Sequence, residues 1–195
     1  LGMLYAKTLL LNKKYVGADK FLTKLQILPF EGATAGRQLY HETKLMQALA
    51  EMNNKNYKKA LQFIADAKLF PENLGVGKPY DADIDERLEN WLDYQCYTSL
   101  GDTQKAQKSL EKIIAFTPKV DNTVMNFLPA NELVSAWAIE KTSSAAKATA
   151  WLQTQASLFP SNKIVQWTLE VYTKKQSNIL TEDEKDGEVR IIEKL

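Results

Sequence analysis

The hydrophobic and polar positions of this chain follow one pattern that occurs four times. In each copy an alanine has an aromatic or small residue three positions before it, an apolar residue four positions after it, and a proline eleven or twelve positions after it. The alanines are Ala18, Ala60, Ala106 and Ala148, which recur at similar intervals. A fixed period of this length indicates an architecture built from repeated supersecondary units.

Each copy of the pattern predicts a pair of helices. Apolar residues three and four positions apart form one face of a helix, and an alanine on that face lets a second helix approach closely. The proline cannot continue a helix, so it separates one pair from the next. The pattern therefore predicts helices over residues 3–12, 15–27, 36–53, 56–69, 83–100, 103–116, 130–140, 144–158 and 162–175.

This phasing of alanine, apolar residue and proline resembles the tetratricopeptide repeat, and so does the turn Leu100-Gly101-Asp102 between the helices of the third unit. The unit of that family is shorter, about 34 residues, and here the additional length falls at residues 30–39, 72–87 and 119–130. The resemblance implies an all-α fold: a right-handed α-solenoid of antiparallel helix pairs, closed by a capping helix over residues 162–175.

The pattern also predicts how the chain is divided. Residues 1–176 are expected to form one tetratricopeptide-like domain of about four helix pairs and the capping helix. Residues 177–195 are expected to form a charged tail, in which Thr181 and Glu184 have the spacing of a capping box and Gly187 weakens the helix that would follow. Because the chain opens without methionine and already inside an amphipathic helix, we expect it to be a piece of a larger protein.

A second resemblance concerns residues 71–87, together with residues 27–33 and 39–42. These segments are similar to the C-terminal repeat region of large uncharacterised bacterial proteins that carry an upstream β-sandwich domain like that of sugar mutarotases. The resemblance implies a bacterial protein whose link to carbohydrate lies in a domain outside this chain. It indicates neither the cytoplasm nor the periplasm.

The charge of the chain argues against two classes of partner. Twenty-five Lys and Arg residues against 24 Asp and Glu give a formal net charge of +1, which creates no field to attract nucleic acid. No apolar run approaches the roughly 20 residues that span a bilayer. We therefore expect no nucleic-acid partner and no membrane span, and a partner that is a protein or the upstream domain of the same protein.

Two short motifs only approximate ligand sites. Gly75, Gly77 and Lys78 resemble the end of a phosphate-binding loop, but the first glycine and the final hydroxyl residue of that motif are missing. The acids at 81, 83 and 85 begin like a calcium loop, but position six is Glu86 and position twelve is Leu92.

Catalytic and metal chemistry have equally little support. The chain has one histidine, His41, and one cysteine, Cys96, which we interpret as a small core residue. The sequence therefore predicts no catalytic residue, no metal and no cofactor.

Binding residues are predicted on two surfaces. In tetratricopeptide domains the first helix of each pair lines a groove, and the positions facing it here are Tyr40, His41, Leu45, Leu49, Trp91, Gln95 and Trp137. The long insert at residues 72–87 is expected to project and to dock against a partner through Lys78, Tyr80 and Arg87.

These residues fit two functions. One is a noncatalytic scaffold for protein–protein or interdomain interaction. The alternative is an accessory part of a carbohydrate-active or carbohydrate-binding protein, in which Tyr80, Trp91 and the acids of residues 81–86 contribute to a sugar site. The second function requires Tyr80 and Trp91 to be exposed.

Overall fold

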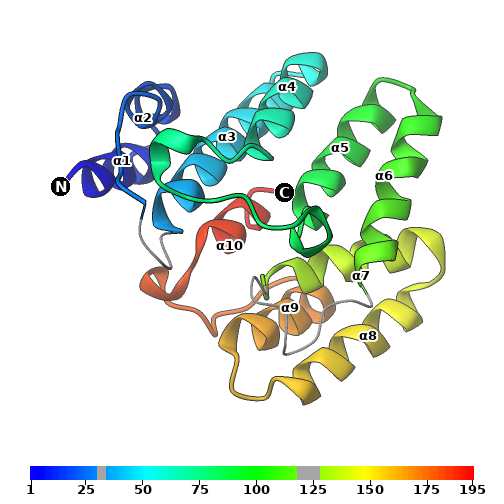
Figure 1. Cartoon of the computed structure of the whole chain (residues 1–195). Helices are drawn as coiled ribbons and strands as arrows, with labels where there is room; N and C mark the ends of the chain where they lie inside the picture. The colour runs from blue at the N-terminus through cyan, green and yellow to red at the C-terminus, as the bar shows by residue number, and fades with distance from the viewer. Residues whose placement is uncertain (30–33, 118–127) are drawn as a thin grey trace. The chain divides into compact units, whose positions relative to one another are not determined.

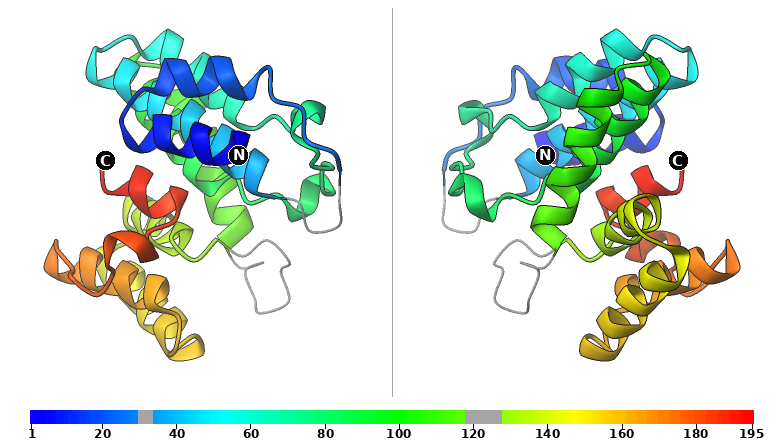
Figure 2. Two further views of the ribbon diagram at one scale, coloured as in Figure 1. Left: turned by 90° about the vertical axis from the view of Figure 1, so that its left-hand side faces the viewer. Right: turned by 90° about the vertical axis from the view of Figure 1, so that its right-hand side faces the viewer.

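The structure is a computed structural model that describes residues 1–29, 34–117 and 128–195. The described residues form ten α-helices with short 3-10 helices and no strand, which confirms the all-α prediction (Figures 1 and 2). The chain divides into two compact units, Leu1–Asp81 and Ala82–Leu195.

The first unit contains four α-helices and one 3-10 helix: α1 (Gly2–Leu11), α2 (Tyr15–Leu22), α3 (Ala35–Asn53), α4 (Tyr57–Ala67) and η1 (Glu72–Leu74). Helix α3 is the central element, because α1, α2 and α4 all pack against it. One core cluster joins Ala6 of α1, Leu22 of α2, Tyr40 of α3 and Leu74 of η1.

The second unit contains the remaining helices: α5 (Arg87–Ser99), α6 (Thr103–Phe116), α7 (Asn131–Thr142), α8 (Ala145–Leu158), α9 (Lys163–Lys174), η4 (Glu182–Glu184) and α10 (Gly187–Ile192). A 3-10 helix, η2 (Asp81–Asp83), lies at the boundary between the units. Helix α7 is central here, since α5, α6, α8 and α9 pack against it.

The four alanines of the sequence pattern lie where they were predicted. Ala18, Ala60, Ala106 and Ala148 are all buried, on α2, α4, α6 and α8. Each of these helices packs against the helix that precedes it. The pattern therefore identified both the helices and the faces through which they pack.

Three of the turns within these pairs have the same backbone. Lys13, Lys55 and Gly101 have φ of 58°, 60° and 75°, and each lies five residues before the repeat alanine. The following N–H donates to the carbonyl five residues back, from Lys14 to Leu9 at 2.9 Å, Asn56 to Glu51 at 2.8 Å and Asp102 to Tyr97 at 2.9 Å. This is the Schellman arrangement of a helix C-terminus. The α7–α8 turn differs, because Ser143 has φ of −143°.

Two predicted helix ends were wrong. Helix α2 ends at Leu22 instead of residue 27. The carbonyls of Leu22 and Leu25 accept hydrogen bonds from the Asn73 side-chain amide, at 2.9 and 2.7 Å, in place of the bonds that a longer helix would give them. Helix α5 begins at Arg87 instead of residue 83. At this helix start the Asp85 carboxylate accepts the Arg87 N–H at 3.1 Å. Pro118, the predicted end of the third pair, lies outside the described residues.

The segment predicted as a charged tail, residues 177–195, contains two short helices, η4 and α10. Residues 177–195 belong to the second compact unit together with α5–α9. The predicted capping box is present, with the Thr181 N–H donating to Glu184 Oε2 at 3.0 Å. Helix α10 then starts at Gly187, and Val189, Ile191 and Ile192 are buried. Burial of these apolar side chains makes the tail part of the unit.

None of the described helices combines the length and the apolar character that crossing a bilayer requires.

The buried alanines generate a test of the helix register. Replacing Ala60 by Leu should overpack the contact of α4 with α3 and lower the free energy of unfolding by about 1–3 kcal/mol. Ala65 lies on the same helix and is exposed, so Ala65→Leu is the matched control and should change stability by less than about 0.5 kcal/mol. Urea denaturation measures both. Equal midpoints for the two variants would contradict the register.

Candidate functional site

The insert at residues 72–87 is held at its root by polar contacts. Asn73 O accepts the Ile27 N–H at 2.8 Å, and the Asn73 side-chain amide donates to the carbonyls of Leu22 and Leu25 at and just beyond the end of α2. Gly75 follows with φ of 71°, and a Cβ there would lie 2.8 Å from the carbonyl oxygen of Ile27. Only glycine meets both the conformation and the close approach. The start of the insert is therefore fixed to the end of α2.

The segment beyond this root carries an exposed aromatic side chain. Tyr80 is 85% exposed. Lys78 Nζ lies 2.7 Å from Asp81 Oδ1, and both side chains are exposed. Such a surface ion pair contributes little to stability. Lys78, Tyr80 and Asp81 are therefore accessible on the described surface.

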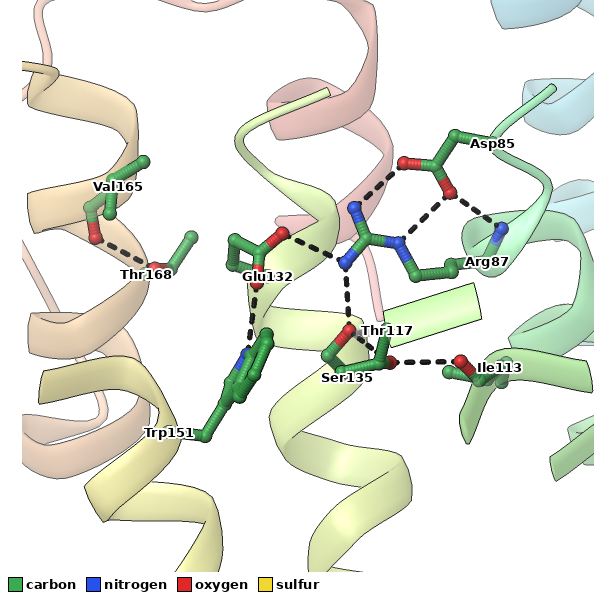
Figure 3. Close-up of polar contacts among 9 residues, drawn as sticks. All are labelled: Asp85, Arg87, Ile113, Thr117, Glu132, Ser135, Trp151, Val165 and Thr168. Carbon is green, nitrogen blue, oxygen red and sulfur yellow. Dashed lines mark hydrogen bonds and ion pairs between the residues drawn. The ribbon is translucent and has the colours of Figure 1, made fainter. Parts of the chain in front are cut away.

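Arg87, the third insert residue that the sequence proposed for docking, lies in a buried cluster instead (Figure 3). Its Nε and Nη2 donate to the two oxygens of Asp85 at 2.9 and 2.7 Å. Its Nη1 donates to Glu132 Oε1 and to Ser135 Oγ, both at 2.8 Å. The guanidinium is thus directed at two carboxylates and a hydroxyl of its own unit.

The cluster continues through the partners of Arg87 (Figure 3). Trp151 of α8 donates its indole N–H to Glu132 Oε2 at 2.9 Å. The hydroxyls of Ser135 and Thr117 share a hydrogen bond of 2.8 Å, and Thr117 also donates to the Ile113 carbonyl. The start of α5 is in this way connected to the end of α6 and to α7 and α8.

Burial and the neighbouring charges shift the pKa values of Arg87 and Glu132 in opposite directions. Burial alone would lower the pKa of Arg87, but Asp85 and Glu132 outweigh it, and the pKa is raised. Burial also raises the pKa of the Glu132 carboxyl, against the opposing effects of Arg87 and the Trp151 N–H. Glu132 makes one hydrogen bond with the guanidinium whereas Asp85 takes the bidentate position. Arg87 is consequently a fixed cation, and the cluster is structural.

The expectation that Arg87 remains available to a partner is therefore corrected: its guanidinium is buried and bound to Asp85 and Glu132. Sequence reasoning also missed Glu132, Ser135 and Trp151 as its partners. One signal was present, because Glu132 is the only charged residue between Leu128 and Ile139, a largely apolar stretch. A carboxylate in such a stretch requires a buried partner.

The aromatic positions assigned to the groove in the second unit do lie together. The Trp91 ring centroid is 5.3 Å from that of Trp137 and 5.1 Å from that of Tyr94. These distances are typical of aromatic packing. Trp91 is only 6% exposed, and Gln95 and Trp137 are partly buried. Trp91 is therefore not an open platform on which a sugar ring could stack.

The corresponding positions of the first unit are buried as well. Tyr40, His41, Leu45 and Leu49 of α3 all have little exposed surface, whereas the sequence placed them toward a groove. The reason for Tyr40 is its place in the cluster with Leu22 and Leu74. None of these four side chains is presented to solvent as a contact surface.

The side chain of Cys96 is also buried. Burial, with a smaller effect of Asp93, raises the pKa of Cys96 to about 12, so the thiol remains protonated at neutral pH. This agrees with its interpretation as a core residue. Across the described ranges, no group of three or more His, Cys, Asp or Glu side chains is arranged to hold a metal ion.

No protein-family model, curated protein or solved structure matches this chain.

The Arg87 cluster generates a stability prediction with a defined pH dependence. Arg87→Leu leaves the carboxylates of Asp85 and Glu132 buried without a cation, and the free energy of unfolding at pH 7 should fall by about 3–5 kcal/mol. The folded-state pKa of Glu132 is already raised by burial, and loss of Arg87 removes an effect that lowers it, so protonation of Glu132 in acid relieves this cost; the deficit should shrink as the pH falls and grow as it rises.

The control for this variant is Lys112→Leu, which removes an exposed cation of the same unit. Thermal and urea unfolding from pH 4 to pH 8 measure both variants. A deficit for Arg87→Leu that is equal to that of the control, or that is independent of pH, would contradict the cluster's structural role.

Proposed function

We propose that this chain is a noncatalytic scaffold for protein–protein or interdomain interaction. Its partner is another protein or another domain of the protein to which the chain belongs. The observation that carries the proposal is Tyr80, a tyrosine with 85% of its surface exposed on an insert whose root is fixed. Large aromatic side chains in such positions are the residues that most often anchor interfaces.

The proposal includes a finer description of the fold. Within each unit, consecutive helices form antiparallel pairs that stack as in a right-handed tetratricopeptide-like solenoid, and α9 caps the pair α7–α8. Two observations support this. The turns at Lys13, Lys55 and Gly101 have one common backbone conformation. Helix contacts within a unit also join each pair's first helix to the next first helix, as α1 joins α3 and α5 joins α7.

The alternative role in carbohydrate binding has less support. It requires Tyr80 and Trp91 as exposed platforms beside carboxylates, and Trp91 is buried against Trp137. Of the acids in residues 81–86, Asp85 is engaged with Arg87. Tyr80, Asp81 and Asp83 remain exposed, and an exposed tyrosine beside carboxylates is also what a protein interface uses.

The test compares Tyr80→Ala with the wild-type chain. Because Tyr80 is exposed, the variant should retain the wild-type melting temperature, and because it anchors the interface, it should lose about 2 kcal/mol or more of binding free energy toward a partner. Partners are captured from an extract of the source organism on immobilised chain and then titrated by calorimetry. Leu158→Ala, which truncates an exposed leucine of α8, is the control.

Partners that bind wild type and Leu158→Ala alike but not Tyr80→Ala would support the scaffold. If all captured partners bind the three chains equally, or if Tyr80→Ala lowers the melting temperature, the insert does not act as a docking element.

A further inference from the structure

A groove of about 500 Å³ lies in the first unit, and no residue proposed above lines it. Its walls are the start of α2 and the start of α4, and its floor is the last part of α3. Tyr15, Val16, Gln47 and Phe63 are among the residues of its inner surface. We call this feature the lysine groove, because Lys13, Lys14 and Lys59 stand around it.

The charge around the lysine groove is unbalanced. Lys59 Nζ lies 2.6 Å from Glu51 Oε1, so these two charges compensate each other. Lys13 and Lys14 are exposed, and neither side chain forms an ion pair with another residue of the described chain. Within the part of the chain that the structure describes, two positive charges therefore remain at the end of the groove where the α1–α2 turn lies.

The inner surface of the lysine groove also carries apolar and aromatic side chains that are partly exposed. Val16 is 59% exposed, and Phe63 and Tyr15 are only partly buried. Gln47 is buried, and within the described residues its Oε1 has no hydrogen-bond partner. An apolar surface beside uncompensated cations fits an aromatic or aliphatic side chain that is followed closely by a carboxylate.

The chain itself carries a segment with this chemistry. The described large apolar side chains that are exposed are Leu1, Leu4, Tyr5, Leu11, Val16, Leu28, Leu69, Tyr80, Leu100, Leu158 and Leu195. Among these, Tyr80 is the one whose next three residues include two acids, Asp81 and Asp83. Both acids are exposed, and among the described residues the ion-pair partner of Asp81 is the exposed Lys78. That pair can exchange for Lys13 or Lys14 at little cost.

We propose that the Tyr80–Asp81 segment of one copy of this chain docks into the lysine groove of a second copy. The inference rests on the proposed role of Tyr80 as a docking element and adds the surface that receives it. Tyr80 would cover Val16 and Phe63, and Asp81 would pair with Lys13 or Lys14. Tyr80 does not line the groove of its own chain, so the contact needs another molecule.

Such a contact is head-to-tail, because the two surfaces that meet are different. Each associated pair of chains therefore keeps one free groove and one free Tyr80, and further copies can add. An interface of one side chain and its neighbours is small, so association is weak and depends on protein concentration. Because charge complementarity contributes to the contact, the association should also weaken as the salt concentration increases.

Sedimentation velocity of the whole chain tests the proposal. The wild-type weight-average sedimentation coefficient should rise with protein concentration at low salt. The rise should be lost in a groove variant, Lys13→Glu with Lys14→Glu, and in an insert variant, Tyr80→Ala with Asp81→Lys. Lys108→Glu with Lys112→Glu reverses two exposed charges on α6 and is the matched control, which should associate like wild type.

The decisive sample is the equimolar mixture of the groove variant and the insert variant, neither of which should self-associate. The insert variant has an intact groove and the groove variant has an intact Tyr80, so the mixture should form a heterodimer that grows no further. A wild-type chain that stays monomeric at all concentrations, or a mixture that fails to associate, overturns the proposal. So does association that both variants retain. Circular dichroism melts establish that the variants are folded.

These experiments distinguish failure of the self-association proposal from failure of the proposed scaffold function. If wild type is monomeric but captured partners still require Tyr80, the self-association is wrong and the scaffold stands. If wild type self-associates through Tyr80 but no captured partner depends on it, the self-association stands and the scaffold for other proteins does not.

Discussion

Close approach of paired helices at a buried alanine is the constraint on which the rest of this structure depends. Ala18, Ala60, Ala106 and Ala148 leave space for the preceding helix, and a larger side chain there would force the pair apart. With the pair fixed, a Schellman turn suffices to join its helices, even where lysine must adopt a positive φ at a cost of about 1–2 kcal/mol. The insert at residues 72–87 follows the pair α3–α4 in the chain and precedes the pair α5–α6.

The insert at residues 72–87 combines two polar anchors with one exposed aromatic side chain. Its start is fixed by Asn73 and its end by the Asp85–Arg87 pair. A buried charged cluster is a poor source of net stability compared with apolar packing, but removal of one member is costly. The cluster therefore fixes where α5 begins, while Tyr80 between these two anchors remains exposed. Anchoring lowers the entropy that an interface loses when it orders a loop.

The sequence could predict the features that follow from the spacing of nearby residues. It could not predict the features that depend on contacts between residues far apart in the chain. The repeat alanines, the turn at Gly101 and the capping box at Thr181 follow from spacing along the chain, and all were found. Arg87 was assigned to the surface because Glu132 lies 45 residues away, and no local pattern joins them. The end of α2 was misjudged for the same reason, since Asn73 is distant in sequence. Exposure of Tyr80, which decides the proposed function, also required the structure.

Site-specific photo-crosslinking from position 80 tests the central proposal, that this chain contacts another molecule through Tyr80. A benzophenone side chain at position 80 of the full chain should give intermolecular adducts, and in the chain alone these should map to residues 13–17 or 59–63 of a second copy. The same probe at position 158, also exposed, supplies the background. Adducts from position 80 at the level of position 158 would contradict the account.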